Sequence, residues 1–576
     1  SGFNLYNIFF NHFNEVVMLF PLLLIGMEEL VVNRRRGLFA LTVALCAVVN
    51  YYFFFGEVLF CVLYFFIRGT LSTDFRCTLK SFGLVALESV LGLLISAVLL
   101  LPSLLVGLSN PRTSDNLNGF NLLVYGNSQR YGLILSSFFF PPDVPARPNF
   151  FPDSNAKWSS VSMYLPLVSM TGVIAYLKGA GKTWLRRILC ICFAVCFIPA
   201  LNAAFSLFNY SYYARWFYMP LLLMALATCL AVERMPGQFP SAFRWTALFT
   251  GAFALIGVLP QKVDGEYVFF SMPEDPARFW VYVLIAAASL LCCVLLYTLR
   301  SRPKVLFRSA CGALAAVTLL TGVFMIVSGR GTASRYDEVI TNGLNGGDNL
   351  SLDTDGGFFR IDTFDELDNL GMFWRIPTIN AFHSVVPSSI MDYYEWIGAE
   401  RGVDSRPETS LLGVRGLLSV KYAFSDNPDY YPMPGFVKTG VQNGYTVYEN
   451  EYYVPMGFSY DYAVTEEQLS SLTAASKDRL LLRALLLSEE DYASVSDILS
   501  VLPDEEVVNG DYSDEMYFDD CLARKALSVD SFRYDSYGFT AETSYDEDRV
   551  VFFSVPYESG WSAAVNGEPV QILKGN

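Results

Sequence analysis

The chain has 576 residues, of which 53% are hydrophobic, 15% aromatic and 17% charged, and its mean hydropathy is +0.35. This is more apolar surface than one soluble core can hide, so the composition excludes an ordinary soluble protein. Charge divides the chain: residues 1–328 carry 23 Lys and Arg against 14 Asp and Glu, a net of +9, whereas residues 329–576 carry 17 against 42, a net of −25. We therefore expect a membrane-embedded domain over residues 1–328 and an acidic soluble domain over residues 329–576.

Ten apolar stretches have the length, or nearly the length, that crosses a bilayer, which is roughly 20 residues for a helix. Short loops rich in Lys and Arg fall on one side of the resulting topology, and this side is predicted to be cytoplasmic. The C-terminal domain then lies outside the cell, and labelling of Cys521 by a reagent that does not cross the bilayer would test this orientation. The expected spans cover residues 16–32, 37–49, 52–67, 83–106, 159–177, 188–203, 214–232, 245–260, 280–298 and 309–327.

Acidic side chains in or near the expected spans are functional candidates by default. They are Glu15, Glu28, Glu29, Glu57 and Glu88. Ion pairing with nearby arginines is expected for Glu28 and Glu29, and a position near a helix start, favourable to a negative charge, is expected for Glu88. No one of the five has a partner in the sequence that identifies it as a general base.

The loop over residues 107–158 is too long for a connector and mixes polar turns with aromatic clusters, as in SSFFFPPDVPARPNFF. Loops of this kind are usually functional, and a simple lid over the helix ends is the alternative interpretation.

The stretch SYYARWFYMPLLLMALATCLAVE places Arg215 at the outer mouth of an expected span. One interpretation is interfacial anchoring, in which the arginine reaches the lipid headgroups beside Tyr213 and Trp216. The other is a site for the phosphate of a lipid carrier, because a guanidinium offers five donors in a rigid fork. Asn202, Asn209 and Tyr213 would then supply hydrogen bonds to a sugar or to phosphate oxygens. The candidate substrate-binding set is therefore Arg215, Tyr213, Trp216, Asn202 and Asn209.

Cysteine and histidine usage argues against a metal centre and a disulfide framework. Cys521 is the only one of the 11 cysteines beyond residue 328, so disulfides within the C-terminal half are excluded. The chain has two histidines, His12 and His383, and no Cys/His metal site is expected.

From residue 329 onward the pattern is that of a soluble domain. Period-two alternation in GYTVYENEYYVPMGFSYD and RVVFFSVPYESGWSAAVNGEPVQIL predicts strands, and the leucine spacing in SKDRLLLRALLLSEEDYASVSDILSVL predicts helix. We therefore expect a mixed α/β domain that is rich in sheet. The chain begins with SGFN and ends with LKGN directly after the strand-like VQIL, and both ends are interpreted as truncated.

Several stretches, in this order, resemble the YfhO family of bacterial multi-pass membrane proteins. They are FPLLLIGMEELV, VVNYYFFFGEVLFCVLYFFIRG, ARWFYMPLLLMALA, GLLSVKYAFSDN, GYTVYENEYYVPMGF and VPYESGWSAAVNG, and the resemblance covers essentially the whole chain. That family resembles the C-type glycosyltransferases (GT-C). The resemblance implies an all-α polytopic membrane bundle of the GT-C type, followed by a C-terminal extracytoplasmic mixed α/β, sheet-rich domain.

The function implied by the resemblance is transfer of a sugar from a polyprenyl-phosphate donor to a cell-envelope polymer, such as lipoteichoic acid, at the outer face of the bacterial plasma membrane. The implied partners are membrane lipids, the lipid-linked sugar and the acceptor polymer, with no nucleic acid, and a divalent metal is left open. In such enzymes an acidic residue in the first outer loop usually acts as base or metal ligand, and here that loop would precede Ser1. The catalytic carboxylate is therefore unassigned, and the fragment is expected to be inactive. A transporter or flippase of a lipid-linked sugar and a non-catalytic envelope assembly factor are the alternatives.

Overall fold

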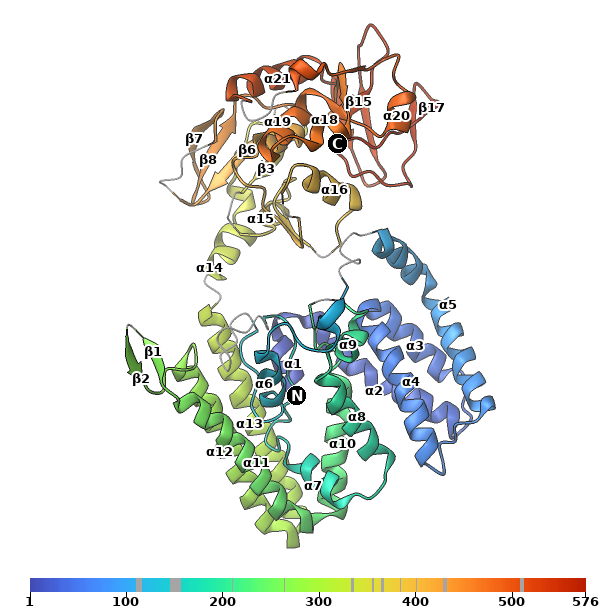
Figure 1. Ribbon diagram of the computed structural model, residues 1–576, viewed down its shortest axis with the longest axis vertical. Helices are drawn as coiled ribbons and strands as arrows, with labels where there is room; N and C mark the ends of the chain where they lie inside the picture. The colour runs from blue at the N-terminus through green and yellow to red at the C-terminus, as the bar shows by residue number, and fades with distance from the viewer. Residues whose placement is uncertain are drawn as a thin grey trace. The chain divides into compact units, whose positions relative to one another are not determined.

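Apolar stretches in the N-terminal half form helices, and strand patterns in the C-terminal half form small sheets (Figure 1). The chain divides into two units: the first is Ser1–Leu108 with Thr113–Ala333, and the second is Ser109–Arg112 with Ser334–Asn576. The computed structural model of the chain describes residues 1–109, 116–145, 157–209, 211–263, 265–332, 336–354, 357–363, 367–383, 385–399, 401–427, 433–507 and 512–576.

The first unit is helical, with one short hairpin between two of its long helices. Its helices are α1 (Gly2–Tyr6), α2 (Asn11–Val31), α3 (Leu38–Val49), α4 (Tyr51–Leu71), α5 (Leu79–Ser109), α6 (Gln129–Ser136), α7 (Thr171–Gly179), α8 (Trp184–Cys196), α9 (Pro199–Ala203), α10 (Tyr218–Arg234), α11 (Phe239–Val258), α12 (Pro276–Thr298) and α13 (Pro303–Thr332). The hairpin consists of β1 (Gln261–Val263) and β2 (Glu266–Val268), and the short 3₁₀ turn η4 (Ala204–Ser206) follows α9.

Within the described residues, five helices are long and apolar enough to cross a membrane, and they contain α4, α5, α11, α12 and α13. A sixth span results if α8 and the α9–η4 stretch, which are bent by 106° at their break, are taken as one. The apolar helix α3 is shorter, at 12 residues. The structure therefore supports a helical membrane part, but it divides the apolar stretches differently from the ten expected spans.

The expected span over residues 159–177 shows why the division differs. It is helical only from Thr171, where α7 begins. Before that point Ser160, Leu167 and Ser169 have φ values of 58°, 67° and 48°, which lie in the left-handed region. Pro166 also disfavours the helical conformation of the residue before it. Apolar composition therefore does not produce a continuous helix here.

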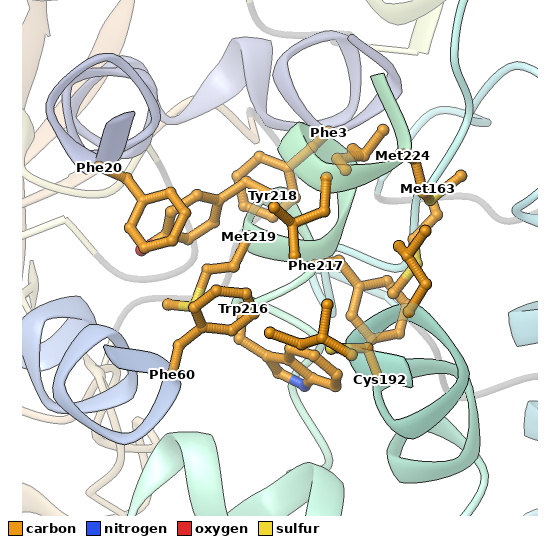
Figure 2. Packing of buried hydrophobic residues seen from close by; sticks show 14 of the residues in the cluster. Phe3, Phe20, Phe60, Met163, Cys192, Trp216, Phe217, Tyr218, Met219 and Met224 are labelled. Atoms are coloured by element: carbon orange, nitrogen blue, oxygen red, sulfur yellow. The ribbon is translucent and has the colours of Figure 1, made fainter. Parts of the chain in front are cut away.

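The centre of the first unit is an aromatic and methionine-rich core around the start of α10 (Figure 2). Phe20 of α2 packs against Phe60 of α4 with ring centroids 5.4 Å apart, and against Tyr218 of α10 at the same distance. Phe3 of α1 packs on the other side of Tyr218, at 5.3 Å. Helices α1, α2, α4 and α10 thus meet at the start of α10, shortly after Arg215. The burial of aromatic rings such as these dominates the energetics of a core.

Three acidic side chains near the spans form ion pairs or hydrogen bonds within the helical unit. Glu29 pairs with Arg35 at 3.3 Å, as expected from the Arg34–Arg36 cluster beside it, whereas Glu28 accepts a hydrogen bond from Arg68 of α4 at 3.0 Å and not from that cluster. Glu88 of α5 is buried and accepts from two backbone N–H groups at the start of α3, at 2.8 and 3.2 Å. Its charge therefore caps a neighbouring helix, where the N-terminal dipole favours an anion.

The second unit contains several small sheets and short helices. Its strands are β3 (Arg360–Asp362), β4 (Ala381–Phe382), β5 (Asp404–Ser405), β6 (Val420–Ser425), β7 (Phe436–Gln442), β8 (Tyr445–Asn450), β9 (Phe458–Ser459), β10 (Tyr462–Val464), β11 (Leu485–Leu486), β12 (Ser500–Val501), β13 (Ser531–Tyr534), β14 (Phe539–Glu542), β15 (Val551–Phe552), β16 (Ala563–Val565) and β17 (Glu568–Val570). Its α-helices are α14 (Tyr336–Glu338), α15 (Leu370–Trp374), α16 (Ser388–Trp396), α17 (Leu412–Leu417), α18 (Glu466–Ser470), α19 (Ala474–Arg483), α20 (Glu489–Ala493) and α21 (Asp514–Ala526).

The largest sheet has the strand order β3-β6-β8-β7, with β3 parallel to β6 and the other pairs antiparallel. Strand β6 is buried along its whole length, whereas β7 is exposed at several positions and forms an edge. Asn443 and Gly444 connect β7 to β8 with φ values of 50° and 83°, the conformation that an Asn-Gly hairpin turn requires. The sheets and helices of this unit confirm the expectation of a domain that contains both.

A buried ion pair anchors α17 to β3. Arg415 and Asp362 both have side chains that are 0% exposed, and the guanidinium donates to one carboxylate oxygen from Nε at 2.9 Å and from Nη2 at 2.7 Å. The other N–H groups donate to the carbonyl oxygens of Pro407, Glu408 and Leu411 at 2.7 to 2.9 Å. All five guanidinium donors are therefore satisfied inside the protein.

Candidate functional site

The segment between η4 and α10 carries four of the five predicted site residues, which are Asn209, Tyr213, Arg215 and Trp216. Its backbone is held in place because Ala214 N–H donates to the carbonyl of Ser159 at 2.8 Å. After Arg215 the chain enters the buried start of α10. The backbone before Arg215 is therefore held by a hydrogen bond, and the backbone after it is buried. Together they fix the point from which the guanidinium projects.

Arg215 lies among aromatic rings. Its guanidinium carbon is 3.9 Å from the ring centroid of Tyr213, 5.0 Å from that of Phe13 and 5.4 Å from that of Tyr52. The side chain is half-buried, and Nε is buried without a hydrogen-bond partner. Within the described residues the guanidinium makes no hydrogen bond or ion pair, so its charge is balanced only by ring faces. Removing a charged group from water is costly unless the charge is paired, so this cation favours the binding of an anion.

Trp216 and Asn202 form a pair inside the core. The indole Nε1–H donates to Oδ1 of Asn202 at 2.7 Å, and both side chains are 2% exposed. The indole also stacks on Phe205, with ring centroids 4.2 Å apart and planes 12° apart. The sequence predicted contacts with a substrate for both residues, but the Asn202 oxygen already accepts the buried indole N–H. Their contacts instead fix the backbone from which Arg215 projects.

Asn209 lies in the turn near the start of this segment. Its side-chain oxygen accepts from the backbone N–H of Ser211 at 2.9 Å, and its backbone bridges to that of Asn116. The side chain is half-buried. The structure therefore brings Tyr213 to Arg215 and Asn202 to Trp216, and it places Asn209 in the supporting turn.

The backbone around this segment is strained. Bulky residues at positive φ are uncommon, and such residues concentrate at functional sites where the surrounding structure holds them. Among the described residues from 158 to 212, seven that are not glycine have positive φ, and they are Trp158, Ser160, Leu167, Ser169, Leu207, Phe208 and Tyr212.

A second guanidinium, that of Arg130 on α6, is buried near the same segment. Its side chain is 5% exposed, and burial lowers its pKa, while Tyr125, Tyr6 and Tyr212 favour its charged form. The rings of Tyr125 and Tyr212 are 5.0 Å apart. Tyr212 and Tyr213 are thus adjacent in sequence and lie near two different arginines.

Asp143, in the long loop, was not singled out by the sequence analysis. Its side chain is buried, and Oδ1 accepts from Arg278 Nε at 2.8 Å and from the Tyr282 hydroxyl at 3.1 Å. Oδ2 is buried and has no hydrogen-bond partner among the residues that the structure describes. Burial raises the pKa of Asp143 to about 6, against the lowering effect of Arg278. The one signal in the sequence is an acidic residue enclosed by apolar residues and prolines in FFFPPDVP.

The part of the long loop that the structure describes, residues 116–145, contributes both Arg130 and Asp143 to the buried part of the first unit. In the described ranges of the chain, no three Asp, Glu, His or Cys side chains gather as metal ligands would.

Fold and site together define a multi-helix membrane protein with a second, sheet-containing unit. In its helical unit the guanidinium of Arg215 lies among aromatic rings and has no anionic partner within the described residues. The chain belongs to the family described as bacterial membrane protein YfhO, whose family model matches residues 1–517. This confirms the resemblance seen in the sequence.

The comparison with curated proteins finds a distant relative. The uncharacterized protein YfhO of Bacillus subtilis (strain 168) is 26% identical over 148 residues, which are 24% of this chain and 17% of that protein. The match therefore spans only a small part of the relative's length. No solved structure matches the chain.

Proposed function

We propose that this protein transfers a sugar from a polyprenyl-phosphate donor to a cell-envelope polymer, such as lipoteichoic acid, at the outer face of the bacterial plasma membrane. The observation that carries the proposal is the half-buried guanidinium of Arg215, which has no anionic partner in the described part of the chain. A phosphate monoester or diester is an anion whose geometry a guanidinium fork matches. The surrounding rings of Phe13, Tyr52 and Tyr213 offer apolar faces to the rest of a lipid-linked sugar.

The proposed reaction gives Arg215 and Asp143 separate roles. The acceptor hydroxyl oxygen bonds to the anomeric carbon as the bond from that carbon to the phosphate oxygen breaks, and the phosphate leaves with the electron pair. Arg215 stabilises the charge that develops on the phosphate. The acceptor proton goes to a carboxylate, for which Asp143 is the candidate because its Oδ2 accepts no hydrogen bond within the described chain; this buried oxygen must become accessible to the acceptor for the step to occur. A pKa of about 6 leaves this carboxylate ionised at neutral pH and basic enough to take the proton.

The role of Arg215 is tested by lipid binding to the full-length protein in nanodiscs. Binding of a polyprenyl phosphate is compared with binding of the matching polyprenol, which lacks the phosphate. Loss of one charge-assisted contact is worth about 1.5–3 kcal/mol, so Arg215→Ala should weaken phosphate binding by about 10- to 150-fold and leave polyprenol binding unchanged. Arg187→Ala, at an exposed arginine of α8, is the matched control. Equal affinity of Arg215→Ala and the parent for the polyprenyl phosphate would refute the assignment.

Transfer itself is tested with a donor that carries a radiolabelled sugar. The full-length protein should move label from lipid to polymer, and Asp143→Asn should reduce the rate while leaving binding of polyprenyl phosphate intact. Binding that depends on phosphate without any transfer would instead support a flippase of lipid-linked sugars. Absence of both would leave the assembly-factor interpretation.

The extracytoplasmic position of the second unit is part of the proposal and needs a probe other than Cys521. That thiol is 1% exposed, and burial raises its pKa to about 12, so it would resist labelling on either side of the membrane. Tyr537 is 95% exposed in the same unit. Tyr537→Cys should react in intact cells with a maleimide that does not cross the bilayer, whereas the parent should not gain this label. Reaction of Tyr537→Cys only after lysis would place the unit inside.

A further inference from the structure

The β1–β2 hairpin between α11 and α12 carries an exposed aromatic rim, which we define as Tyr267, Phe269 and Phe270. Their side chains are 71%, 62% and 53% exposed, and Val268 between them is 43% exposed. Four consecutive apolar side chains exposed in this way are unusual for a surface in water.

The backbone holds the rim outward. Phe270 has a φ of 62°, a left-handed conformation that is rare for an aromatic residue. Its N–H donates to the carbonyl of Val258 at the end of α11 at 3.3 Å, and its ring lies 5.8 Å from that of Trp280 on α12. The Ser271 hydroxyl donates to the carbonyl of Val268 at 2.7 Å. The turn is therefore fixed against both helices, and it presents Phe269 and Phe270 instead of burying them.

The position of the hairpin identifies what the rim contacts. The hairpin joins two helices that are each long and apolar enough to span the membrane. Only 28% of an apolar 18-residue stretch in each helix is buried inside the protein. Exposed apolar side chains on α11 lead up to the rim, with Leu255 at 66% and Leu259 at 49%. The rim thus continues the surface of the first unit that faces lipid.

The polar side chains of the hairpin suit the headgroup layer. Lys262 is exposed and pairs with Tyr267 across the two strands, so both side chains lie on one face. Glu266, next to Tyr267 in β2, lies on the opposite face because strand side chains alternate. An ammonium beside an aromatic ring is the pattern of residues that reach lipid phosphates from a membrane interface.

We propose that the aromatic rim is inserted into the headgroup layer of the bilayer at this end of the helices, with phospholipid as its partner and the Lys262 side chain at the phosphates. The hairpin then acts as an interfacial anchor that sets the depth of α11 and α12. This inference does not depend on the sugar-transfer reaction or on Arg215.

Depth-dependent fluorescence quenching tests the anchor. Cys190, Cys229 and Cys311 are exposed and are replaced by alanine to lower the background of labelling. An environment-sensitive dye is then attached to Phe269→Cys in the full-length protein, reconstituted in phosphatidylcholine vesicles with a minor fraction of phosphatidylglycerol. Glu266→Cys, nearer the tip of the hairpin, is the matched control.

Lipids spin-labelled at the headgroup should quench the dye at Phe269→Cys at least about twofold more than the dye at Glu266→Cys, and aqueous iodide should show the reverse order. Tyr267→Cys, at a second position of the rim, should behave like Phe269→Cys. Agreement between the two variants shows that the result does not come from misfolding of one of them. Equal iodide quenching at all three positions, without quenching by lipid, would overturn the proposal. The proposal would also be overturned if the rim were protected from both quenchers and this protection increased with the density of protein in the vesicles. A second copy of the protein would then cover the rim.

Discussion

The substitution Arg415→Met gives the sharpest test of the packing in the second unit. It replaces a guanidinium whose five N–H groups are all bonded, and it leaves the Asp362 side chain, which is 0% exposed, without its charge partner. Breaking a buried pair by removing one partner lowers the free energy of unfolding by about 3–5 kcal/mol. A domain is stable by about 5–15 kcal/mol, so the variant should lie close to its unfolding threshold.

Cys521 reports this change directly. Its thiol is 1% exposed and lies in the same hydrophobic cluster as α17. When opening is fast and reversible, the labelling rate follows the population of open molecules. A loss of about 3–5 kcal/mol therefore predicts labelling of Cys521 faster by about two to three and a half orders of magnitude, measured by mass spectrometry of the peptide that contains it.

Two further variants separate the buried ion pair from general damage. Replacing both partners, in Arg415→Met with Asp362→Leu, should recover much of the stability, because an apolar pair leaves no uncompensated charge. Arg479→Met breaks the partly exposed pair with Asp514 and should change labelling by less than about tenfold. The reasoning is refuted if Arg415→Met labels at the parental rate, or if the double variant is no more stable than the single one.

The remaining predictions concern the first unit. Glu88→Ala removes two hydrogen bonds at the start of α3 and should lower the free energy of unfolding by about 1–2 kcal/mol in thermal unfolding, whereas Glu29→Ala, near the surface, should have little effect. Asn202→Ala leaves the Trp216 N–H buried without a partner, so a loss of about 1–3 kcal/mol and a change in tryptophan fluorescence are expected, and unchanged values of both would contradict the pairing. The folded-state pKa of Asp143 is raised from 3.8 to about 6, so its contribution to stability is present below pH 3.8 and is lost as pH rises to 6. Unfolding measured across this window should show a decline of at most about 3 kcal/mol, and Asp143→Asn should remove that decline.

Local patterns predicted much of the secondary structure for reasons that act over a few residues. Period-two alternation in GYTVYENEYYVPMGF predicted a strand, and β8 forms at its start, directly after the Asn443-Gly444 turn. The apolar stretches that became α4, α5 and α13 are long helices, because an uninterrupted apolar run satisfies its backbone within itself. The stretch over residues 159–177 failed this pattern, because its first part is held in left-handed conformations by contacts that hydropathy does not describe.

The candidate site was predictable only in part. Arg215 was identified because the predicted topology places it at the outer end of an apolar stretch, where the positive-inside rule calls for no positive charge. Two of the three rings around it, those of Phe13 and Tyr52, come from distant parts of the chain. Asn202 illustrates the opposite case. It is a polar residue near the site, but its side-chain oxygen accepts the Trp216 N–H inside the core.

The sequence by itself determined that this protein has a helical membrane half and an acidic half that contains sheets, because composition, charge and periodicity are properties of consecutive residues. Only the tertiary structure decided which polar groups already have partners. The Asn202 oxygen accepts the Trp216 N–H, the guanidinium of Arg215 has no anionic partner within the described residues, and Cys521 and one oxygen of Asp143 are buried. The physical reason is that hydrogen-bond satisfaction and burial depend on neighbours brought together from distant segments, which no local pattern specifies.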